Sequence, residues 1–213
     1  SVRFVPNADW NGTVTNGISF HAWDQSSGSV GGIADISGVS TLRDEFNAIS
    51  YSNNDGSVNW TSDWIEANDD GIASTSNIRV EGNKLHVDNL DGGSFSSITR
   101  EADLAAATTA TLTLDYDGIR EGVVGGDRFT VEVSNDGGST WSLLEEITVP
   151  GETTANMPFS GSLSYALESA VTLTNDMSIR MSISSGFGGT NQHVNFDNVQ
   201  ISYSENTGGT TAF

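Results

Sequence analysis

The stretch TATLTLDYD at residues 109–117 decides the fold class, because apolar and polar side chains alternate along it. Leu112, Leu114 and Tyr116 fall on one side of an extended chain, while threonine and aspartate fall on the other. A strand with one face in the core and one face in water has this period of two. The stretch therefore predicts a half-buried strand of an antiparallel sheet.

The same alternation recurs in DRFTVEVS at 127–134 and in MSIRMSI at 177–183. Shorter segments of the same kind lie at 78–80, 84–88, 95–100 and 141–149. Turns rich in Gly, Asn and Asp separate these segments, and the one short helical candidate lies near 163–168. Strands of this length and spacing predict an all-β fold, an antiparallel β-sandwich.

The last strand candidate, HVNFDNVQISY at 193–203, contains an irregularity. Apolar positions up to Phe196 have one parity and those from Val199 onward have the other, so the apolar phase slips at Asp197–Asn198. A β-bulge at this point would keep both sets of apolar residues on the buried face. The bulge would either re-aim Asp197 for a function or mark an irregular end to an ordinary strand.

The chain of 213 residues carries 28 acidic residues and 8 Lys or Arg residues, a formal net charge of −20, and it has no cysteine. A compact domain with this charge repels itself, and carboxylates are the hard oxygen ligands that Ca²⁺ takes. We therefore expect several calcium ions to offset the repulsion. The composition excludes disulfides and thiolate metal sites, and it argues against nucleic-acid binding. The chain lacks a run of 18 apolar residues, which argues against membrane insertion.

Signatures of catalysis are missing from the sequence. The histidines, His21, His86 and His193, do not have the H-E-x-x-H spacing, and no G-x-S-x-G motif occurs. Paired carboxylates for glycoside hydrolysis remain open, because acidic residues are so abundant. SNDGGSTW at 134–141 has the pattern of an Asp-box, which predicts a structural hairpin. We therefore expect a binding module and not an enzyme.

Four carboxylates flank one hairpin loop in DYDGIREGVVGGD at 115–127. They are Asp115, Asp117, Glu121 and Asp127. Antiparallel closure would bring them close enough to repel one another unless a cation or protons intervene, so we predict that they bind Ca²⁺. The alternative is that Arg120 and Arg128 pair with them as solvated salt bridges, which stabilise little.

Asn and Asp also gather beside Gly in three further loops, at 52–57, 66–71 and 88–93. Turn geometry accounts for most of these residues, since their side chains hydrogen-bond to the local backbone. None of the loops has the spacing of an EF-hand. Any calcium site is therefore expected to be assembled from several loops.

A glycine-rich segment, SGFGGTNQHVNFD at 185–197, is the candidate ligand-binding loop. Glycine lets a ligand approach the backbone closely, and neutral polar side chains follow. With two glycines of the 121–127 loop, the candidate ligand-binding residues are Gly125, Gly126, Gly188, Gly189, Asn191, Gln192 and His193. The carboxylate of a peptide C-terminus would complete the coordination of a Ca²⁺ here. The alternative is a hairpin tip without a ligand.

The two ends of the chain differ from its middle. PNADWNG at 6–12, AWD at 22–24 and GGIAD at 31–35 stand near the start, and NTGGTTAF closes the chain at 206–213. This order resembles the cadherin-like or immunoglobulin-like tandem repeats of giant bacterial surface proteins, interrupted within a Gly/Thr-rich loop. The resemblance implies a domain inserted in that loop, since exposed loops tolerate insertions. The expected parts are a partial repeat at 1–38, an inserted domain at 39–205 and a return segment at 206–213.

Five motifs follow one another along the inserted domain. They are DEF (44–46), NWTSDWIE (59–66), LTLDYD (112–117), GGDRFTVEVSNDGGSTW (125–141) and FDNVQIS (196–202). Their order resembles a concanavalin-type jelly roll of the MAM or carbohydrate-module kind. In such domains an acidic residue near the first strand and the Asp of the last strand share a structural calcium. The resemblance thus implies calcium ligands at Glu45, with its neighbour Asp44, and at Asp197.

A jelly roll split into such a repeat is similar to the peptide-binding domains of bacterial RTX adhesins. The resemblance implies a calcium-dependent adhesin module that binds proteins or peptides, through exposed C-termini, on a host or partner cell. It also implies an extracellular location on a bacterial surface, a role in cell adhesion and biofilms, and a monomeric domain within a long chain. One alternative is a calcium-dependent carbohydrate-binding module or lectin, in which Trp60 or Trp64 would stack on sugars, although core positions are expected for both. The other is a structural spacer.

Overall fold

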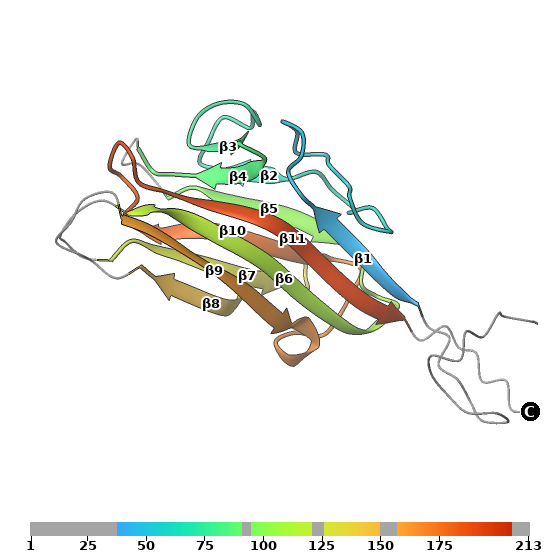
Figure 1. Cartoon of the computed structure of the whole chain (residues 1–213). Helices are drawn as coiled ribbons and strands as arrows, with labels where there is room; N and C mark the ends of the chain where they lie inside the picture. The colour runs from blue at the N-terminus through green and yellow to red at the C-terminus, as the bar shows by residue number, and fades with distance from the viewer. Residues whose placement is uncertain (1–37, 91–94, 121–125, 150–156, 206–213) are drawn as a thin grey trace, which may run out of the picture. The chain divides into compact units, whose positions relative to one another are not determined.

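The computed structural model describes residues 38–90, 95–120, 126–149 and 157–205. They form two antiparallel sheets packed face to face (Figure 1). The predicted all-β sandwich is therefore confirmed. The terminal segments that were expected to form a split repeat, along with Glu121 and Gly125, lie outside these ranges. Among the residues described, no helix has the length and apolar character needed to cross a membrane.

The first sheet runs in the order β3–β4–β11–β6–β9, and β1 also pairs with β11. Its strands are β3 (Ile78–Glu81), β4 (Lys84–Val87), β11 (His193–Glu205), β6 (Ala107–Arg120), β9 (Met157–Ala166) and β1 (Val39–Asp44). The second sheet runs in the order β2–β5–β10–β7–β8. Its strands are β2 (Ile65–Ala67), β5 (Ser97–Ala102), β10 (Met177–Ser185), β7 (Arg128–Ser134) and β8 (Ser142–Thr148).

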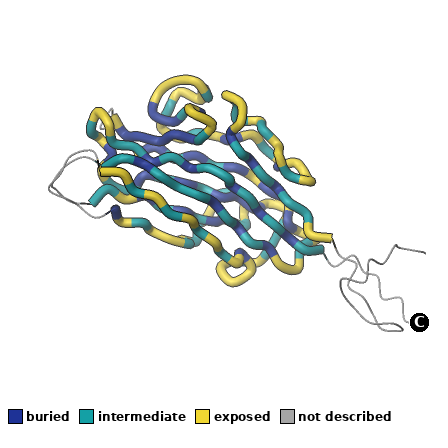
Figure 2. Tube along the Cα trace, in the orientation of Figure 1, coloured by how far each residue is buried: buried dark blue, intermediate teal, exposed yellow. Residues whose placement is uncertain are grey.

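The core lies between the two sheets, and the buried positions alternate along the central strands (Figure 2). In β6, for example, Ala110, Leu112 and Leu114 are buried and the residues between them are not. The helix expected near 163–168 was wrong, because alternation continues through β9 to Ala166. Only a 3-10 turn, η1 (Leu167–Ser169), follows it.

β11 contains the predicted bulge. Its register with β6 shifts between Asp197 and Gln200, and Asn198 adopts a left-handed φ of 50°. Phe196 and Val199, on either side of the shift, are both buried. The extra residue therefore keeps both halves of the strand facing the core, as the slip in apolar phase required.

The bulge also divides the edge of β11 that faces away from β6. The half before it pairs with β4, and the half after it pairs with β1. β1 runs antiparallel to β11, so that Val39 lies opposite Ser204. The first and last strands of the described chain therefore begin and end side by side.

One ion pair crosses the core between the sheets. Arg100 of β5 donates from Nη1 to Oδ2 of Asp44 in β1 at 2.6 Å, and both side chains are fully buried. Trp64 Nε1 donates to the same carboxylate at 2.9 Å, and the backbone N–H of Phe46 donates to its other oxygen at 2.8 Å. Asp44 is therefore engaged by three donors.

Arg100 is held from every side. Its other nitrogens donate to the backbone oxygens of Asn53 at 2.6 Å and Ser62 at 3.1 Å. Its guanidinium lies 5.0 Å from the centroid of the Trp60 ring and 5.4 Å from that of Trp64. Both tryptophans are buried, so they occupy the core positions expected for them. A buried charge with this set of partners anchors β5 to β1 and to the loop between β1 and β2.

Candidate functional site

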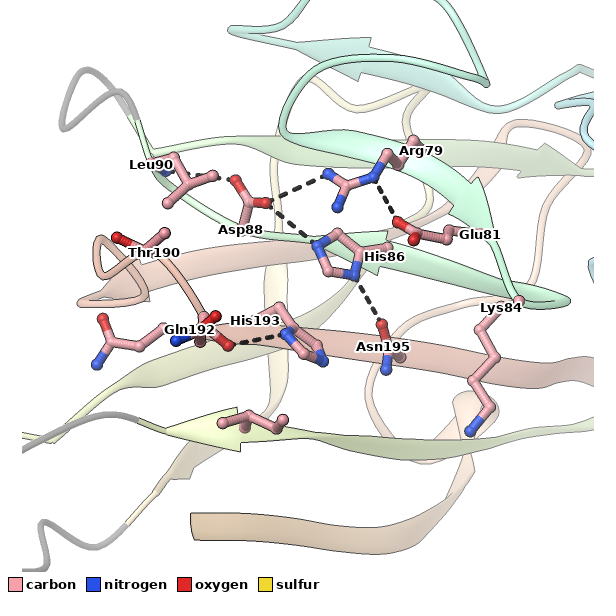
Figure 3. Close-up of a pocket in the computed structure, with 13 residues that line it drawn as sticks. Arg79, Glu81, Lys84, His86, Asp88, Leu90, Thr190, Gln192, His193 and Asn195 are labelled. Atoms are coloured by element: carbon pink, nitrogen blue, oxygen red, sulfur yellow. Dashed lines mark hydrogen bonds and ion pairs between the residues drawn. The ribbon is translucent and has the colours of Figure 1, made fainter. Parts of the chain in front are cut away.

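A pocket of about 650 Å³ opens on the outer face of the first sheet, at the edge formed by β3 and β4 (Figure 3). Val80 and Leu85 point into the core, so the alternating side chains of these two strands point outward. The pocket is lined from β3 and β4 by Arg79, Glu81, Lys84, His86 and Asp88, and from the other side by Thr190, Asn191, Gln192, His193 and Asn195.

A row of polar side chains crosses the sheet beneath the pocket. Arg79, His86, Asn195 and Asp117 are successive cross-strand neighbours on β3, β4, β11 and β6. His86 Nδ1 lies 3.0 Å from Asn195 Oδ1, and Asn195 Nδ2 donates to Asp117 Oδ1 at 2.8 Å. Asp117 also forms an ion pair with Lys84. Side chains opposite one another on a sheet face are in direct contact, so the backbone register fixes this network.

The His86 ring lies between two acceptors. Its Nδ1 faces the Asn195 oxygen, and its Nε2 lies 3.1 Å from Asp88 Oδ2. The pKa of Asp88 is lowered: burial acts to raise it, but the hydrogen bonds from His86 and the Leu90 backbone, together with Arg79, outweigh burial. The floor of the pocket is thus an alternating arrangement of donors and acceptors.

His193 stacks on His86, with ring centroids 4.6 Å apart. Its Nδ1 lies 3.0 Å from the backbone oxygen of Asn191. Burial, followed by the neighbouring His86, lowers the pKa of His193, although Asn191, Asp117 and Asp88 act in the other direction. The neutral ring donates from Nδ1 to Asn191 and leaves Nε2 as an acceptor for a ligand.

Asp127 fixes the loop that closes the pocket. The backbone N–H of Phe187 donates to its Oδ1 at 3.0 Å, and Gln192 Nε2 donates to its Oδ2 at 3.3 Å. A side chain at Gly186, where φ is 75°, would clash with this carboxylate. Burial raises the pKa of Asp127, and the hydrogen bond from Phe187 acts against it. Asp127, an expected calcium ligand, therefore also anchors this loop.

The expected ligand-binding residues are only partly brought together. Asn191, Gln192 and His193 line the pocket. Gly188 and Gly189 belong to the same loop but are not part of the lining, although Gly189 donates to Gln192 Oε1 at 2.6 Å. Gly126 lies near the end of β8, where a Cβ added to it would be 3.3 Å from Thr148. Sequence reasoning missed Arg79, Lys84 and His86, which line the opposite wall.

Three of the expected calcium ligands, Asp115, Asp117 and Asp197, lie on the outer face of the first sheet. Asp115 lies opposite Asp197, and its oxygens accept from Ser162 at 2.5 Å and Asn198 at 2.9 Å. Burial, together with the nearby Asp115 and Asp117, raises the pKa of Asp197. Glu45 forms an ion pair with Arg43 at 2.6 Å. Asp44 is buried in its ion pair with Arg100.

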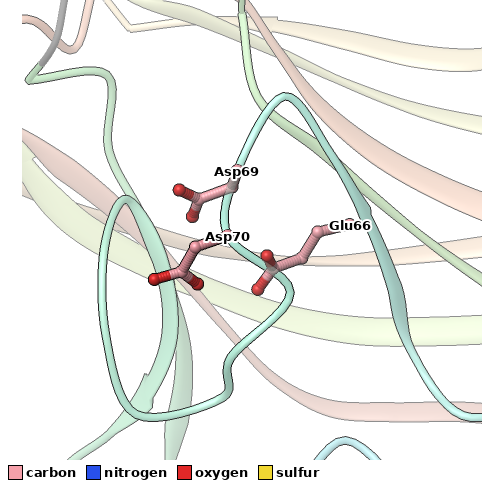
Figure 4. A group of neighbouring side chains, drawn as sticks. All are labelled: Glu66, Asp69 and Asp70. Carbon is pink, nitrogen blue, oxygen red and sulfur yellow. The ribbon is translucent and has the colours of Figure 1, made fainter.

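Within the part of the chain that the structure describes, one cluster of three acidic side chains has ligand atoms close enough to hold a metal ion together. It comprises Glu66, Asp69 and Asp70, with ligand atoms within 4.8 Å of one another (Figure 4). Burial raises the pKa of Glu66, and the charges of Asp69 and Asp70 raise it further, although Tyr51 and Gly71 donate to it. The acidic loop 66–71 is visible in the sequence, but spacing alone did not single it out.

The Asp-box hairpin has the expected structural form. Asp136 accepts from the backbone of Thr140 at 2.8 Å, from its hydroxyl at 2.7 Å and from Ser134 Oγ at 2.7 Å. These hydrogen bonds lower the pKa of Asp136 to about 2. Trp141 packs against Gly138 on the turn, and Arg180 lies over its ring at 4.0 Å.

No protein-family model matches this sequence, and no curated protein matches it either. Solved structures with a similar fold exist. The K1 cleaved adhesin domain of Lys-gingipain from Porphyromonas gingivalis W83 is 15% identical, with a TM-score of 0.44, covering 76% of this chain and 96% of that one. The C-terminal family 22 carbohydrate-binding module of Clostridium thermocellum Xyn10B is 12% identical, with a TM-score of 0.43, covering 78% and 94%.

A third structure, the N-terminal cellulose-binding domain of Cellulomonas fimi β-1,4-glucanase C, is 14% identical, with a TM-score of 0.40, covering 65% of this chain and 86% of that one. The neighbours are thus adhesin domains and carbohydrate-binding modules.

Proposed function

We propose that this chain is a ligand-binding module, without catalytic activity, of an extracellular adhesin on a bacterial surface. Its pocket between β4 and the 190–193 loop binds a protein ligand through the carboxylate of an exposed C-terminus. Bound Ca²⁺ stabilises the module beside the pocket. The observation that carries the proposal is the concentration of cationic and imidazole side chains in one pocket of a chain with a net charge of −20.

The pocket gathers groups that are scarce elsewhere. Lys84 is the only lysine of the chain, and two of the three histidines stack here. Lys84 pairs with Asp117 and keeps two further N–H donors. Arg79 pairs through Nε and Nη1 with Glu81 and Asp88. Its Nη2 makes no hydrogen bond to the described residues, so both cations can donate to a ligand carboxylate.

His193 adds an acceptor to these donors. A C-terminal residue presents a carboxylate together with a backbone N–H, and it matches a site that combines cationic donors with the acceptor Nε2 of His193. The carbohydrate alternative has less support in this pocket, because the described residues that line it include no Trp, Tyr or Phe. Trp60 and Trp64, the rings considered for sugar stacking, are buried in the core.

We expect a free peptide carboxylate to be required for binding. A library of peptides with free C-termini should contain ligands that lose about tenfold or more in affinity, some 1.4 kcal/mol, when the terminus is amidated. Lys84→Met should cause a similar loss, because a carboxylate loses a charge-assisted donor. Calorimetric titration of both peptide forms into both proteins measures the effect.

Arg43→Met is the matched control, since it removes one positive charge from the same sheet face outside the pocket. It should leave the affinity within about twofold, because long-range surface electrostatics are screened by salt. Equal binding of amidated peptides would contradict carboxylate recognition. Binding to a glycan array that Lys84→Met abolishes would instead identify a lectin, and no ligand in either screen would identify a spacer.

For calcium, the Glu66–Asp69–Asp70 group is the candidate that fits. Its donor set is oxygen only, as Ca²⁺ requires. Burial, followed by the charges of Asp69 and Asp70, raises the pKa of Glu66, and a cation would relieve this repulsion. Backbone N–H groups already hold these carboxylates in place: Ile78 at the start of β3 donates to Asp69 at 2.5 Å, and Ile72 of the preceding loop donates to Asp70 at 2.9 Å. The ion would supply positive charge that ties the 66–71 loop to β3.

Chelation is expected to lower the melting temperature. At a free Ca²⁺ concentration of 100 times Kd, binding stabilises the folded state by about 2.7 kcal/mol. Scanning calorimetry with and without EDTA measures the shift. The double variant Asp69→Asn/Asp70→Asn should no longer respond to EDTA, while Glu145→Gln/Glu146→Gln, with the same change in charge, should respond fully. Equal melting curves with and without the chelator would rule out the calcium proposal.

Acidification is expected to weaken the fold through His193. Its pKa is lowered in the folded protein from an ordinary value of 6.5, so the unfolded chain binds the proton at higher pH. The free energy of unfolding should therefore decrease as the pH falls from about 6.5 towards the folded pKa. Urea unfolding across this range should show a slope that His193→Gln reduces. An unchanged slope would mean that other groups titrate in this pH range. Asp88 and Asp117 are not among them, because their lowered pKa values place their titration below it.

A further inference from the structure

We propose that the free edge of β9 binds an extended segment of a partner protein, which adds to the first sheet as a further strand. β9 spans Met157–Ala166 and pairs with β6 along its whole length without a register shift. It ends the strand order of the first sheet, so within the described residues no strand pairs with its other edge (Figure 1). This surface is separate from the pocket, and the proposal does not depend on the proposed function.

The other edges of the first sheet are covered. Along β1, Val58 N donates to the Thr41 oxygen at 3.0 Å and Asp55 N donates to the Arg43 oxygen at 2.9 Å, so the 55–58 segment covers this edge. β3 has only four residues, and the backbone N–H of its Val80 donates across to the loop before it. Neither strand therefore presents a long open edge.

The edges of the second sheet are protected in other ways. β2 has only three residues. β8 carries two adjacent charges, Glu145 and Glu146, and its register with β7 shifts between Val131 and Glu132. Short length, charge and bulges are the devices by which proteins prevent unwanted strand pairing.

β9 lacks these devices. Its sequence, MPFSGSLSYA, contains no charged residue, although the chain has 28 acidic residues. Pro158, which has no backbone N–H, interrupts the row of donors only near the start of β9. Along the rest of the strand, none of its backbone groups bonds to a described residue outside the first sheet. A long, regular and uncharged edge of this kind is a template for strand addition.

The side chains of β9 indicate what an added strand should look like. On the core side, Phe159 and Leu163 are half-buried and pack against the core, whereas Ser160, Ser162 and Ser164 point outward and are exposed. An added strand continues this alternation, because side chains of neighbouring strands share a face. The partner segment therefore has apolar residues at every second position and small polar residues between them.

The acidic residues near β9 and the net charge of the chain favour a partner protein over a second copy of this chain. Glu145 lies beside β9, where it accepts from Tyr165 at 3.2 Å, and Glu168 follows the strand. Two copies joined through β9 would each bring a net charge of −20, which disfavours the pairing. A neutral or apolar strand with Lys or Arg at its ends complements this surface.

The test is residue-resolved amide hydrogen exchange on the full chain. The probe is a short synthetic peptide of alternating valine and threonine between pairs of lysines, and its control replaces the threonines with prolines. Strand addition should slow exchange at alternate amides of β9 by about tenfold or more, and leave β3 and β8 unchanged. A third peptide with glutamates in place of lysines should protect β9 less.

Two proline variants provide an independent readout. Neighbouring residues of a strand direct their N–H groups to opposite sides, so one of Ser162→Pro and Leu163→Pro keeps the β6 ladder and should fold but lose the protection. Absence of protection at millimolar peptide, or protection by the proline peptide, would overturn the proposal. Protection of the same amides that increases with protein concentration, together with a dimer in sedimentation, would show that the occupant is a second copy. That result would also overturn the proposal.

Discussion

Replacing Arg100 with methionine is expected to lower the free energy of unfolding by about 3–5 kcal/mol, because it leaves the buried charge of Asp44 without its partner. Both side chains are inaccessible to solvent, so water cannot replace the lost donor. The same substitution leaves the backbone oxygens of Asn53 and Ser62 without their hydrogen bonds. Urea unfolding of the variant and the parent protein at pH 7 measures the difference.

Two further variants separate the charge from the packing. Arg43→Met removes a partly exposed guanidinium, paired with Glu45, and should cost less than about 1 kcal/mol. The double variant Asp44→Leu/Arg100→Met should recover part of the loss, since an apolar pair avoids an unpaired buried charge. If Arg100→Met were as stable as the parent protein, the ion pair would not hold the two sheets together.

Replacing Phe196 with alanine should produce a loss of similar size, about 3–5 kcal/mol, because it opens a cavity in the middle of the core. Phe196 lies on β11, and 1% of its surface is exposed. Its ring meets Phe129 of the opposite sheet edge-on, with centroids 5.3 Å apart. The substitution therefore removes both buried area and an aromatic pair.

Phe95→Ala provides the control, since the Phe95 side chain is 44% exposed. It removes the same atoms from a loop position and should change the free energy of unfolding by about 0.5 kcal/mol or less. Thermal unfolding of both variants, followed by near-ultraviolet circular dichroism, checks the comparison. Similar losses at the two positions would mean that the core does not run through β11.

The strands and the bulge could be predicted because they depend on a binary pattern. Alternation in 109–117 and 177–183 fixes which side chains face the core, and the slip at Asp197–Asn198 fixes where an extra residue is needed. The helix near 163–168 could not be recognised as wrong, since a few residues fit either period. The local pattern was therefore sufficient to predict the long strands.

The Arg100–Asp44 pair was missed, although the sequence contains a signal for it. In β5, Arg100 shares the inward parity of Ile98 and Ala102, and a charge on the apolar side of a strand indicates a buried partner. The identity of the partner depends on how β1 packs across from β5, which no local pattern gives. Asp44 was therefore assigned to calcium from a resemblance instead.

One wall of the pocket could be predicted from the sequence and the other could not, because the second wall depends on packing between distant segments. Asn191, Gln192 and His193 belong to one loop and were recognised together. Lys84 and His86 join them only because β4 pairs with the first half of β11, a contact between segments far apart in sequence. Asp115 and Asp117 lie on β6, and Asp127 lies in the loop before β7, whereas Glu66, Asp69 and Asp70 are close because a single loop holds them.

The position of Val39 opposite Ser204 has a mechanical consequence. Tension that pulls these two residues apart acts at one end of the antiparallel β1–β11 pair. The force is directed along the hydrogen bonds between the strands, which lie perpendicular to the strands. The bonds then break one after another, as in a zipper, and the load reaches the bulge before it reaches β4. A pulling force would therefore detach β1 first, while the half of the sandwich that carries the pocket remains unstrained.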